Sequence, residues 1–574
     1  MPWFEYPNLR ALGKTYRQDK RGGYDVVLIS GDAYVDHPSF PAAVICRRLE
    51  DLGLKTAVIA QPDWRSTDDF KVFGAPNLFF AVTAGSMDSM VANFTAMKMP
   101  RREDRLSPAG KPGLRPKRAV QVYCQRLRES FPETPIVIGG IEASLRRFSH
   151  YDFWEDRIRD SILIDSNADL LVYGMAEAVL PSIVEWFAKR NIANRDEIPH
   201  FPQTCIRVKP GSWKEFEYPA PLMLPTAQEC RDNPEAFLRL SKILDAGVSA
   251  MPNMIVQKHP KGDIVCFPFA RENWTEETLL ISKGKYNRRA HPLYQDPIPG
   301  LIPVQFSVIS HHGCLGTCTF CALSAHQGRC IRSRTPQSII DEIRSFTKHP
   351  DFKGTVPDIG GASVNMYGWH CLRDSCVGRN CTLPGICSNL SGGLKPLADL
   401  LRRAAAVPGV KHVFVGSGLR YDLVRTQDVN EFEYLIENHV SGQLKVAPEH
   451  LDKAVLNMMR KGADSDFADF VAKFRESAKK VGKKIFLVPY FMTVFPGSGE
   501  SDEKIKDFVA QHRLVHEQVQ EFTPTPSTLA TAMFYAERDL DGNPIKTAKN
   551  IIERKAGRTG LHSSARSVRK LRHP

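Results

Sequence analysis

The feature that most constrains this chain of 574 residues is a repeated alternation of strand-like and helix-like segments. Between about residues 24 and 190, short apolar runs such as YDVVLIS and TPIVIGG are separated by stretches with apolar residues at helical spacing. A second alternation, from about residue 305 to 535, holds about six strand–helix units. Strands that alternate with helices form parallel sheets with helices on both faces. The sequence therefore predicts an α/β protein with two such regions.

The two alternations and the segments around them predict four parts. We expect a parallel-sheet α/β domain over residues 1–190, a Pro-rich linker or insertion over 191–300, and a partial βα barrel similar to a TIM barrel over 301–535. Residues 536–574 are expected to form a basic, disordered tail. Because ligands of such sheets and barrels bind at the carboxyl ends of the strands, the candidate residues are those that directly follow each strand.

The net charge of +13 is concentrated in two segments. Residues 98–118 carry eight Lys and Arg against two acidic residues, and residues 546–574 carry nine against one, so the rest of the chain is close to neutral. Neither segment has apolar periodicity, which favours a solvated loop and a disordered end, with weak contact to a nucleic acid as the alternative. The chain contains no run of about 18 apolar residues and no apolar leader, so we expect a cytoplasmic protein without a membrane span.

Eight of the 13 cysteines fall between residues 314 and 387. Three of them, Cys314, Cys318 and Cys321, stand in a C-x3-C-x2-C pattern (SHHGCLGTCTFCAL) after the first strand of the second alternation. Three thiolates on one short loop can hold three irons of a [4Fe-4S] cluster and leave the fourth iron open to a ligand that is not protein. Structural zinc normally takes four ligands, so this pattern favours the cluster over zinc.

A second group of four cysteines lies in a loop rich in Gly, Pro and Arg, and consists of Cys371, Cys376, Cys381 and Cys387. Such a loop packs poorly by itself, which indicates a second site closed by a metal. Four thiolates suit either zinc or a second iron–sulfur cluster, and reduced cysteines without a metal remain an alternative. For the first group, zinc also remains an alternative, with a fourth ligand from Cys330, His311 or His326.

Several motifs resemble those of the YgiQ-type (UPF0313) family of radical S-adenosylmethionine (SAM) proteins. The cysteine pattern, with Phe320 before its last cysteine, is similar to the signature of the radical SAM superfamily. The other matching motifs are GGIEASLRRFSHYDFW at 139–154, YGMAE at 173–177, HQGR at 326–329, GGASVNMYG at 360–368, VGSGLRYDL at 415–423, VAPEH at 446–450 and FTPTPSTLATAMFY at 522–535. The resemblance therefore covers about residues 24–535.

The resemblance implies a mechanism. A [4Fe-4S] cluster on the three cysteines would bind SAM through its open iron and cleave it reductively to a 5′-deoxyadenosyl radical, which acts on an unknown substrate. A low-potential electron donor of the flavodoxin or ferredoxin type would supply the electron. The N-terminal domain would resemble a Rossmann-like cobalamin module, but the usual D-x-H-x-x-G loop is absent, since Asp36 and His37 are neighbours. This departure argues against a histidine-ligated cobalamin and leaves open cobalamin without a protein ligand.

The resemblance also implies contacts with SAM, all after strands of the second alternation: Gly360 and Gly361, then Ser417 and Arg420, then Glu449 and His450. In the superfamily a Glu follows the two glycines and holds the amino group of SAM. Here Ala362 takes its place, so the acid is missing. The last four residues are candidates for contacts with the carboxylate and ribose of SAM.

A dense group of polar and aromatic residues lies in the first alternation: Arg146, Arg147, His150, Tyr151, Asp152 and Trp154. It is expected either to bind substrate or to form a salt-bridge network between domains. The function favoured by all these patterns is a radical SAM enzyme of unknown substrate. One alternative is a tRNA-modifying enzyme similar to methylthiotransferases, which the basic segments favour and the lack of a recognisable RNA-binding domain does not. Another is a non-catalytic interaction protein stapled by zinc.

Overall fold

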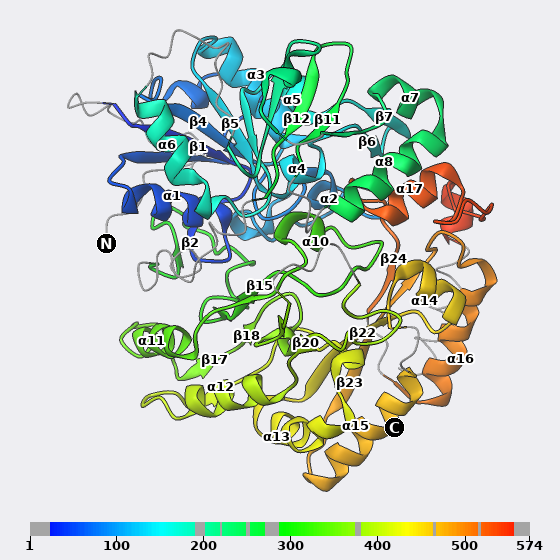
Figure 1. Ribbon diagram of the computed structural model, residues 1–574. Helices are drawn as coiled ribbons and strands as arrows, with labels where there is room; N and C mark the ends of the chain where they lie inside the picture. The colour runs from blue at the N-terminus through cyan, green and yellow to red at the C-terminus, as the bar shows by residue number, and fades with distance from the viewer. Residues whose placement is uncertain are drawn as a thin grey trace. The chain divides into compact units, whose positions relative to one another are not determined.

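The chain forms two compact units in the computed structural model, which describes residues 23–189, 201–218, 221–247, 253–269, 286–373, 380–462, 466–514 and 518–555 (Figure 1). The N-terminal unit comprises residues 1–240 and 251–305, and the C-terminal unit comprises residues 241–250 and 306–574. Each unit has its own hydrophobic core. Within the described residues, no helix combines the length and the apolar character needed to cross a lipid bilayer.

The N-terminal unit is built on a nine-stranded sheet with the strand order β10-β11-β12-β9-β8-β5-β4-β1-β3. Its parallel part consists of β1 (Val26–Ser30), β3 (Thr56–Ala60), β4 (Phe79–Thr83), β5 (Ile136–Gly139) and β8 (Leu170–Val172). All residues of β1 and β3 are buried, as expected for parallel strands covered on both faces. The helices around this part are α1 (Pro41–Asp51), α2 (Ser89–Asn93), α3 (Ala119–Ser130), α4 (Gly140–Leu145), α5 (Ile162–Ser166) and α6 (Leu180–Lys189).

Residues that we assigned to a Pro-rich linker or insertion extend this same sheet. They form β9 (Thr204–Val208), β10 (Leu222–Met223), β11 (Ile255–Gln257) and β12 (Asp263–Cys266). The pairings of β8 with β9, β9 with β12 and β12 with β11 are antiparallel. The segment also holds α7 (Ala227–Asp232) and α8 (Pro234–Gly247). Strands of two to five residues between prolines give little periodicity, which is why the sequence pattern did not indicate them.

Three short strand pairs lie outside the nine-stranded sheet. They are the hairpin of β6 (His150–Asp152) and β7 (Arg157–Arg159), the pair of β2 (Val35–Asp36) and β13 (Arg289–Ala290), and the pair of β19 (His370–Cys371) and β20 (Leu390–Ser391). All three pairs are antiparallel.

The C-terminal unit contains a series of parallel strands. β14 (Val308–Ile309) pairs with β18 (Ile359–Gly360), β17 (Thr355–Val356) pairs with β21 (His412–Val413), and β22 (Gln443–Glu449), β23 (Phe486–Thr493) and β24 (Gln518–Glu521) form one sheet. A parallel bridge between Leu419 and Val446 continues the series. The predicted fold class, an α/β sheet domain followed by a partial βα barrel, is confirmed.

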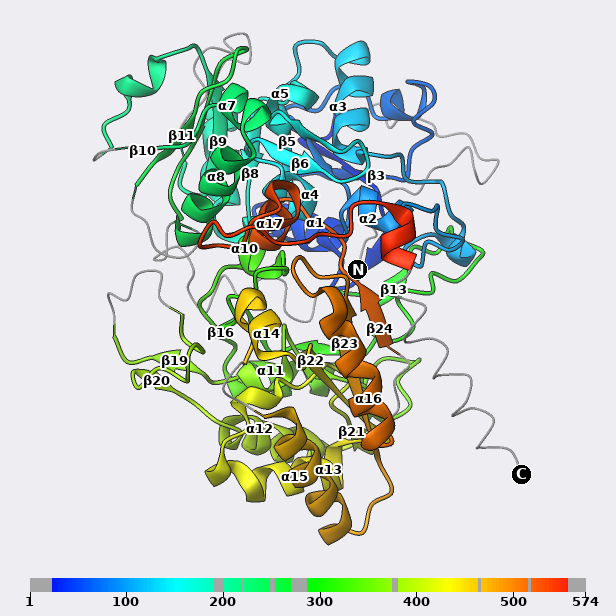
Figure 2. The ribbon, with the colours of Figure 1, turned by 90° about the vertical axis from the view of Figure 1, so that its right-hand side faces the viewer.

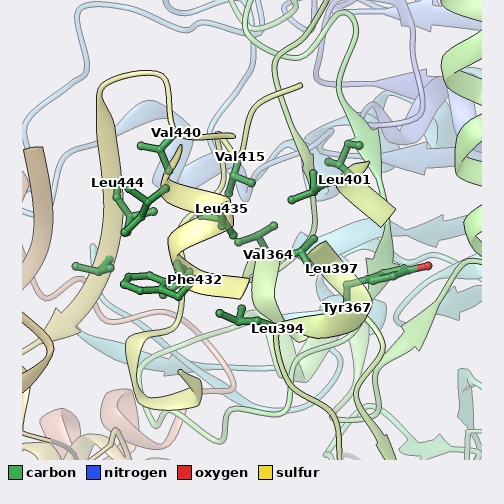
Figure 3. Close-up of a cluster of buried hydrophobic side chains, with 14 of the residues drawn as sticks. Val364, Tyr367, Leu394, Leu397, Leu401, Val415, Phe432, Leu435, Val440 and Leu444 are labelled. Carbon is green, nitrogen blue, oxygen red and sulfur yellow. The ribbon is translucent and has the colours of Figure 1, made fainter. Parts of the chain in front are cut away.

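Helices alternate with these strands and carry the core of the C-terminal unit. They are α10 (Leu323–Gln327), α11 (Pro336–Phe346), α12 (Lys395–Ala405), α13 (Val429–His439), α14 (Lys453–Met459), α15 (Phe467–Lys480), α16 (Glu503–Gln511) and α17 (Leu529–Ala536). Leu397 and Leu401 lie one turn apart on α12 and pack with Phe432 and Leu435 of α13 in the same buried cluster (Figure 3). Apolar residues of α15 and α16 pack on β22 and β23 in this cluster, which places both helices beside that sheet (Figure 2).

The two basic segments differ from the expectation of solvated chain. In the first, Arg115 is 1% exposed and forms ion pairs with Asp32 and Asp104, so its charge belongs to the interior of the N-terminal unit. In the second, Arg554 is 2% exposed and donates hydrogen bonds to the carbonyls of Phe522 and Ala548. The described part of the predicted tail therefore packs on the C-terminal unit up to residue 555, and residues 556–574 lie outside the described residues.

Candidate functional site

The three cysteines of the first group lie after β14, in the segment that joins β15 (His311–His312) to its antiparallel partner β16 (Arg332–Ser333). This loop is at the carboxyl end of the first barrel strand, where barrel chemistry is expected. The backbone N–H of Gly316 donates to Cys314 Sγ at 3.4 Å, and the N–H of Cys321 donates to the carbonyl of Cys318 at 3.1 Å, as in a turn. All three thiols are partly accessible, whereas Cys330 is exposed.

The three thiols influence one another's ionisation. Burial raises the pKa of the Cys314 thiol, and burial together with the charges of Cys318 and Cys314 raises the pKa of Cys321 to about 12. Three thiolates at this place therefore need cations to stabilise them. Among the described residues, no three His, Cys, Asp or Glu side chains converge as ligands of one metal ion. A [4Fe-4S] cluster spreads its thiolates over separate irons, so the loop fits a cluster better than a single ion.

Arg420 lies against this loop. Its side chain is 3% exposed, and Nε donates to both carboxylate oxygens of Asp422 at 2.9 Å. A Cβ on Gly316 would overlap Nη1 of Arg420, so the guanidinium and the cysteine loop are in close contact. Nη2 of Arg420 is buried without a hydrogen-bond partner. The predicted SAM contact therefore has one donor still available beside the cysteines.

Gly360 and Gly361 end β18 next to side chains of the chain itself. A Cβ on Gly360 would overlap the hydroxyl of Ser417, and a Cβ on Gly361 would lie 2.5 Å from Cε1 and Nε2 of His311. The hydroxyl of Ser417 donates to Asp358, which also accepts the N–H groups of Gly416 at 2.9 Å and Ser417 at 3.0 Å. The donor capacity of Ser417 is thus already used by Asp358, a residue that the motif did not single out.

His311 is held in one orientation beside these glycines. Its Nδ1 lies 2.9 Å from Ser310 Oγ, which donates to the carbonyl of Gly360, while Nε2 is buried without a hydrogen-bond partner. Burial lowers the pKa of His311 to about 4, so the ring is neutral at neutral pH.

Glu449, the last residue of β22, and the next residue, His450, differ in whether their side chains are already hydrogen-bonded. His450 is fully buried, with Nε2 3.2 Å from Asp502 and Nδ1 accepting the N–H of Asp452 at 3.0 Å, so both ring nitrogens are engaged. Glu449 has the left-handed φ of +68°, which is uncommon for a residue with a side chain. Burial raises the pKa of Glu449, and the charges of Lys461 and Arg420 partly oppose this rise. Of the pair, Glu449 is the residue that faces the charged groups around the cysteines.

Lys461 is a residue of this site that the sequence patterns did not indicate. It follows α14 and is 6% exposed. Its positive charge lowers the pKa values of Cys314, Asp422 and Glu449, and a Cβ on the next residue, Gly462, would lie 3.1 Å from a carboxylate oxygen of Asp422. No motif connects Lys461 with cysteines more than 130 residues away, so only the tertiary structure brings them together.

The second cysteine group is described only in part, because Cys376 lies outside the described residues. Cys371 is exposed, and Cys381 and Cys387 pack against the buried cluster that contains Leu315 and Trp369. The N–H of Cys387 donates to the carbonyl of Cys381 at 2.9 Å. The amide oxygen of Asn380 accepts a hydrogen bond from the hydroxyl of Thr317, so this loop contacts the first cysteine loop directly.

The polar residues at the carboxyl edge of the N-terminal sheet bond to one another. Asp32 pairs with Arg115 at 2.9 Å and accepts the N–H of Ser86 at 2.6 Å. The carboxylate of Glu142 accepts the N–H groups of Ser89 at 2.8 Å and Val120 at 3.1 Å. A Cβ on Gly31 would overlap the carbonyl of Ala84, which shows how tightly this edge is packed.

The dense polar group of the first alternation is likewise bonded within the N-terminal unit. Arg146 pairs with Asp88, Arg147 donates to the carbonyl of Ser144, and Asp152 accepts from Arg118. The remaining contacts are His150 Nδ1 with the carbonyl of Phe148, the Tyr151 hydroxyl with Asp156, and Trp154 packed beside Phe94. These contacts fix the hairpin of β6 and β7 on the sheet.

Comparison with known proteins covers nearly the whole chain. Residues 13–307 match the family model "Radical SAM N-terminal", and residues 308–509 match "Radical SAM superfamily". A UPF0313 protein of Methanocella arvoryzae is 43% identical over 545 residues, covering 94% of this chain and 90% of the relative. A UPF0313 protein of Clostridium perfringens is 41% identical, covering 90% of this chain and 78% of the relative.

A solved structure has the same fold at low sequence identity. The radical SAM methyltransferase TsrM from Kitasatospora setae, solved with cobalamin and a [4Fe-4S] cluster bound, has a TM-score of 0.53 and 12% identity. The match covers 95% of this chain and 89% of TsrM. This likeness supports the architecture of a sheet domain followed by a partial barrel.

Proposed function

The chain belongs to the UPF0313 family of radical SAM proteins, and from this membership we propose that it is an enzyme that cleaves SAM with a [4Fe-4S] cluster held by Cys314, Cys318 and Cys321. Radical SAM proteins bind this cluster and SAM, which confirms the cofactors expected from the motifs. When bound, the cluster supplies the single electron that breaks a carbon–sulfur bond of SAM and yields a 5′-deoxyadenosyl radical. The electron donor is then a low-potential flavodoxin or ferredoxin, and the substrate carries an unactivated C–H bond.

The observation that carries the proposal is the cysteine loop itself. Its three sulfurs lie close enough to raise the pKa of Cys321, and no fourth cysteine of the described residues on the loop competes for the open iron. Arg420 lies against the loop, and the charge of Lys461 reaches Cys314. Cations at this place stabilise thiolates, and Cys381 and Cys387 of the second group pack against the buried cluster that contains Leu315 of the loop.

Reconstitution under anaerobic conditions tests this proposal. The protein with Cys314, Cys318 and Cys321 all replaced by Ala should lose the iron and sulfide of the cluster and release no 5′-deoxyadenosine from SAM in the presence of dithionite. The matched control is Cys330→Ala, since Cys330 is an exposed cysteine close in sequence. Release of 5′-deoxyadenosine by the triple variant at the rate of the control would exclude the proposed site.

We also propose that Cys371, Cys376, Cys381 and Cys387 bind a second metal, either zinc or a second iron–sulfur cluster. Support comes from the composition of the loop and from the half-buried position of Cys381 and Cys387 next to the first cysteine loop. Any zinc or iron that stays in the purified triple Cys-to-Ala variant is then assigned to this group.

The residues of the N-terminal unit do not fit cobalamin, the cofactor bound in TsrM. His37 is fully buried, and its Nε2 lies 3.0 Å from Arg288, so the ring is not available to ligate cobalt. Asp36 is paired with Arg47 at 2.5 Å. At the carboxyl edge of the sheet, Asp32 pairs with Arg115, and Glu142 accepts the N–H of Ser89. The proposed function therefore includes no cobalamin that is ligated by His37.

The tRNA-modifying alternative rested on the two basic segments. In the described residues, Arg115 and Arg118 of the first segment form ion pairs with acidic side chains of the N-terminal unit. Charges that are neutralised inside the fold attract phosphates weakly, so these two arginines do not favour an RNA substrate. The exposed cations of the same segment are Arg101, Arg102, Arg105, Lys111 and Lys117.

A further inference from the structure

Two cysteines far from the cysteine-rich region face each other in the N-terminal sheet. Cys205 lies on β9 and Cys266 on β12, and the two residues are register partners in this antiparallel pair. The N–H of Phe267 donates to the carbonyl of Thr204 at 2.8 Å, so the neighbouring pair is hydrogen-bonded and the cysteine pair is not. Residues of a non-hydrogen-bonded pair have Cα atoms about 4.5 Å apart, a separation that a disulfide can span.

Both thiols point to the same face of the sheet, because register partners in adjacent strands do so. Leu171 of β8 is the other register partner of Cys205, and Tyr173 lies two residues further along, so its ring is on this face too. The hydroxyl of Tyr173 donates to the carbonyl of Phe267, next to Cys266, at 2.7 Å. The opposite face carries residues of the apolar core, among them Val172, Ile206 and Val265. The thiols therefore point away from that core.

A buried guanidinium lies over the same face. Arg147, in the motif at residues 139–154, is 5% exposed and stacks on Tyr173, with Cζ 5.1 Å from the centre of the ring. Its Nη1 donates to the carbonyl of Ser144, and its Nε is buried without a hydrogen-bond partner. Among the described residues, Arg147 makes no ion pair with a carboxylate. A buried cation without an anion is unfavourable, so a thiolate on this face would be its counterion.

The two thiols differ in their ionisation. Burial alone would raise the pKa of Cys266, but the neighbouring Cys205 thiol and the charge of Arg147 bring this pKa below its usual value. Burial and the neighbouring Cys266 raise the pKa of Cys205 well above its usual value. The pair therefore holds one thiolate, on Cys266, and one thiol, on Cys205. A thiolate beside a thiol is the arrangement in which a disulfide forms.

We propose that Cys205 and Cys266 are a redox-active pair that reacts with hydrogen peroxide and closes a reversible disulfide between β9 and β12. The Cys266 thiolate attacks one peroxide oxygen, the O–O bond breaks, and a sulfenic acid forms while hydroxide leaves. Hydroxide takes the proton of Cys205 to give water, and the Cys205 sulfur displaces hydroxide from the sulfenic acid. One thiolate, one thiol and one peroxide thus yield one disulfide, one water and one hydroxide, and two electrons pass from sulfur to oxygen.

The chemical class of the oxidant follows from burial. Cys205 is 0% exposed and Cys266 is 3% exposed, so a small peroxide is favoured over a bulky disulfide such as oxidised glutathione. A dithiol reductant that reaches the pair when the strands open would restore both thiols. Arg147 is a positioning residue in this proposal, because it acts on the peroxide through the Cys266 thiolate.

Two other cysteines of the N-terminal unit are matched internal controls. Cys46 on α1 and Cys124 on α3 are both 0% exposed, and burial raises the pKa of each thiol. No second cysteine is among the groups that shift these two pKa values. We therefore expect both to stay reduced under conditions that oxidise the pair.

Oxidation resolved by site tests the pair. The full chain and the variant with Ala at all three cluster cysteines are treated with equimolar hydrogen peroxide, quenched in acid, alkylated under denaturing conditions and digested for mass spectrometry. Peptides linked through Cys205 and Cys266 should appear in both proteins and disappear after dithiothreitol, whereas Cys46 and Cys124 should be alkylated. Because the Ala variant lacks the proposed cluster ligands, its result does not depend on the proposed function.

Single substitutions separate the roles of the three residues. Cys205→Ser should leave a sulfenic acid on Cys266 that dimedone traps, and Cys266→Ser should give no dimedone adduct on Cys205. Arg147→Gln should slow disulfide formation about tenfold, the effect of raising a thiol pKa by about one unit, and Arg147→Lys should slow it less. Melting temperatures show that each variant is folded.

Two results would overturn the proposal. One is the absence of the linked peptides from both folded proteins, and the other is oxidation of Cys205 and Cys266 no faster than that of Cys46 and Cys124. A folded Arg147→Gln variant that forms the disulfide at the wild-type rate would exclude the role of Arg147.

Discussion

At the scale of single residues, Gly360 and Gly361 at the end of β18 show that a motif residue can be required by packing as well as by a ligand. The resemblance to radical SAM proteins assigned Gly360 and Gly361 to the approach of SAM. In the structure, their missing side chains make room for Ser417 and for the ring of His311. His311 in turn is fixed by Ser310, so it has little freedom to move away. Glycine at position 361 is therefore required by packing whether or not a ligand is present.

We predict that Gly361→Ala destabilises the protein by about 1–3 kcal/mol, the usual range for forcing a methyl group into a packed interior. The new Cβ would lie 2.5 Å from His311 Nε2, and the ring would have to leave its hydrogen bond with Ser310. Thermal unfolding of the variant should therefore occur at a lower temperature. Gly385→Ala is the control, because a Cβ there meets no atom within 4 Å. Equal melting temperatures of the two variants would show that His311 moves freely.

At the scale of elements, a short helix gains its position from the loop that it meets. α14 has seven residues, too few to be stable alone. The carboxylate of Asp452 caps its first turn by accepting the N–H groups of Ala454 and Val455. Its last carbonyls accept from Thr319 of the cysteine loop. The order of α14 and the order of the cysteine loop are therefore coupled.

Thr319→Val tests this coupling. The substitution keeps the shape of the side chain, removes the hydroxyl and leaves the carbonyl of Met458 without that donor. We expect SAM to bind several-fold more weakly, because a lost neutral hydrogen bond of about 1 kcal/mol loosens the contact between the turn after α14 and the cysteine loop. Equilibrium dialysis of SAM against cluster-loaded protein measures this affinity. Unchanged affinity for SAM would mean that the backbone N–H of Thr319 alone fixes the turn.

At the scale of the whole molecule, each unit buries ionisable groups, and the N-terminal unit does so at several places. Burial raises the pKa of Asp32, Glu142 and Glu177, and burial lowers the pKa of His291 to about 4. Between about pH 6.5 and 4, a histidine with such a lowered pKa stays neutral in the folded state, whereas it is protonated in the unfolded chain. Its contribution to stability is therefore present at neutral pH and is lost as the pH falls toward 4. The raised carboxyl groups act in the opposite direction over part of this range.

A comparison of wild type with His291→Asn separates the effect of His291 on the pH dependence of stability from the effect of the carboxyl groups. Between pH 6.5 and 5, the folded state of wild type should lose about 2 kcal/mol through His291, an upper value for 1.5 units of pH. The variant lacks this loss, so its free energy of unfolding should depend less on pH over the same interval. Urea unfolding at pH 7 and pH 5 measures both. Parallel losses in the two proteins would mean that His291 is protonated in the folded state.

The sequence alone determined the fold class, because alternating strands and helices have few packing solutions, and it determined the family, because several long motifs occur in order. It also placed three cysteines on one loop, since their spacing is local. It did not indicate the short strands β9 to β12, whose pairing partners supply the order that their own residues do not.

The tertiary structure decided which polar residues remain available. His450 and Ser417 looked like SAM contacts in the sequence, yet Asp502 and Asp358 occupy them. Thr319 belonged to no candidate site, yet it fixes the cysteine loop to the end of α14 through the carbonyls of Met458 and Met459. Availability depends on partners that are distant in the chain, and only the folded molecule brings those partners within hydrogen-bond distance.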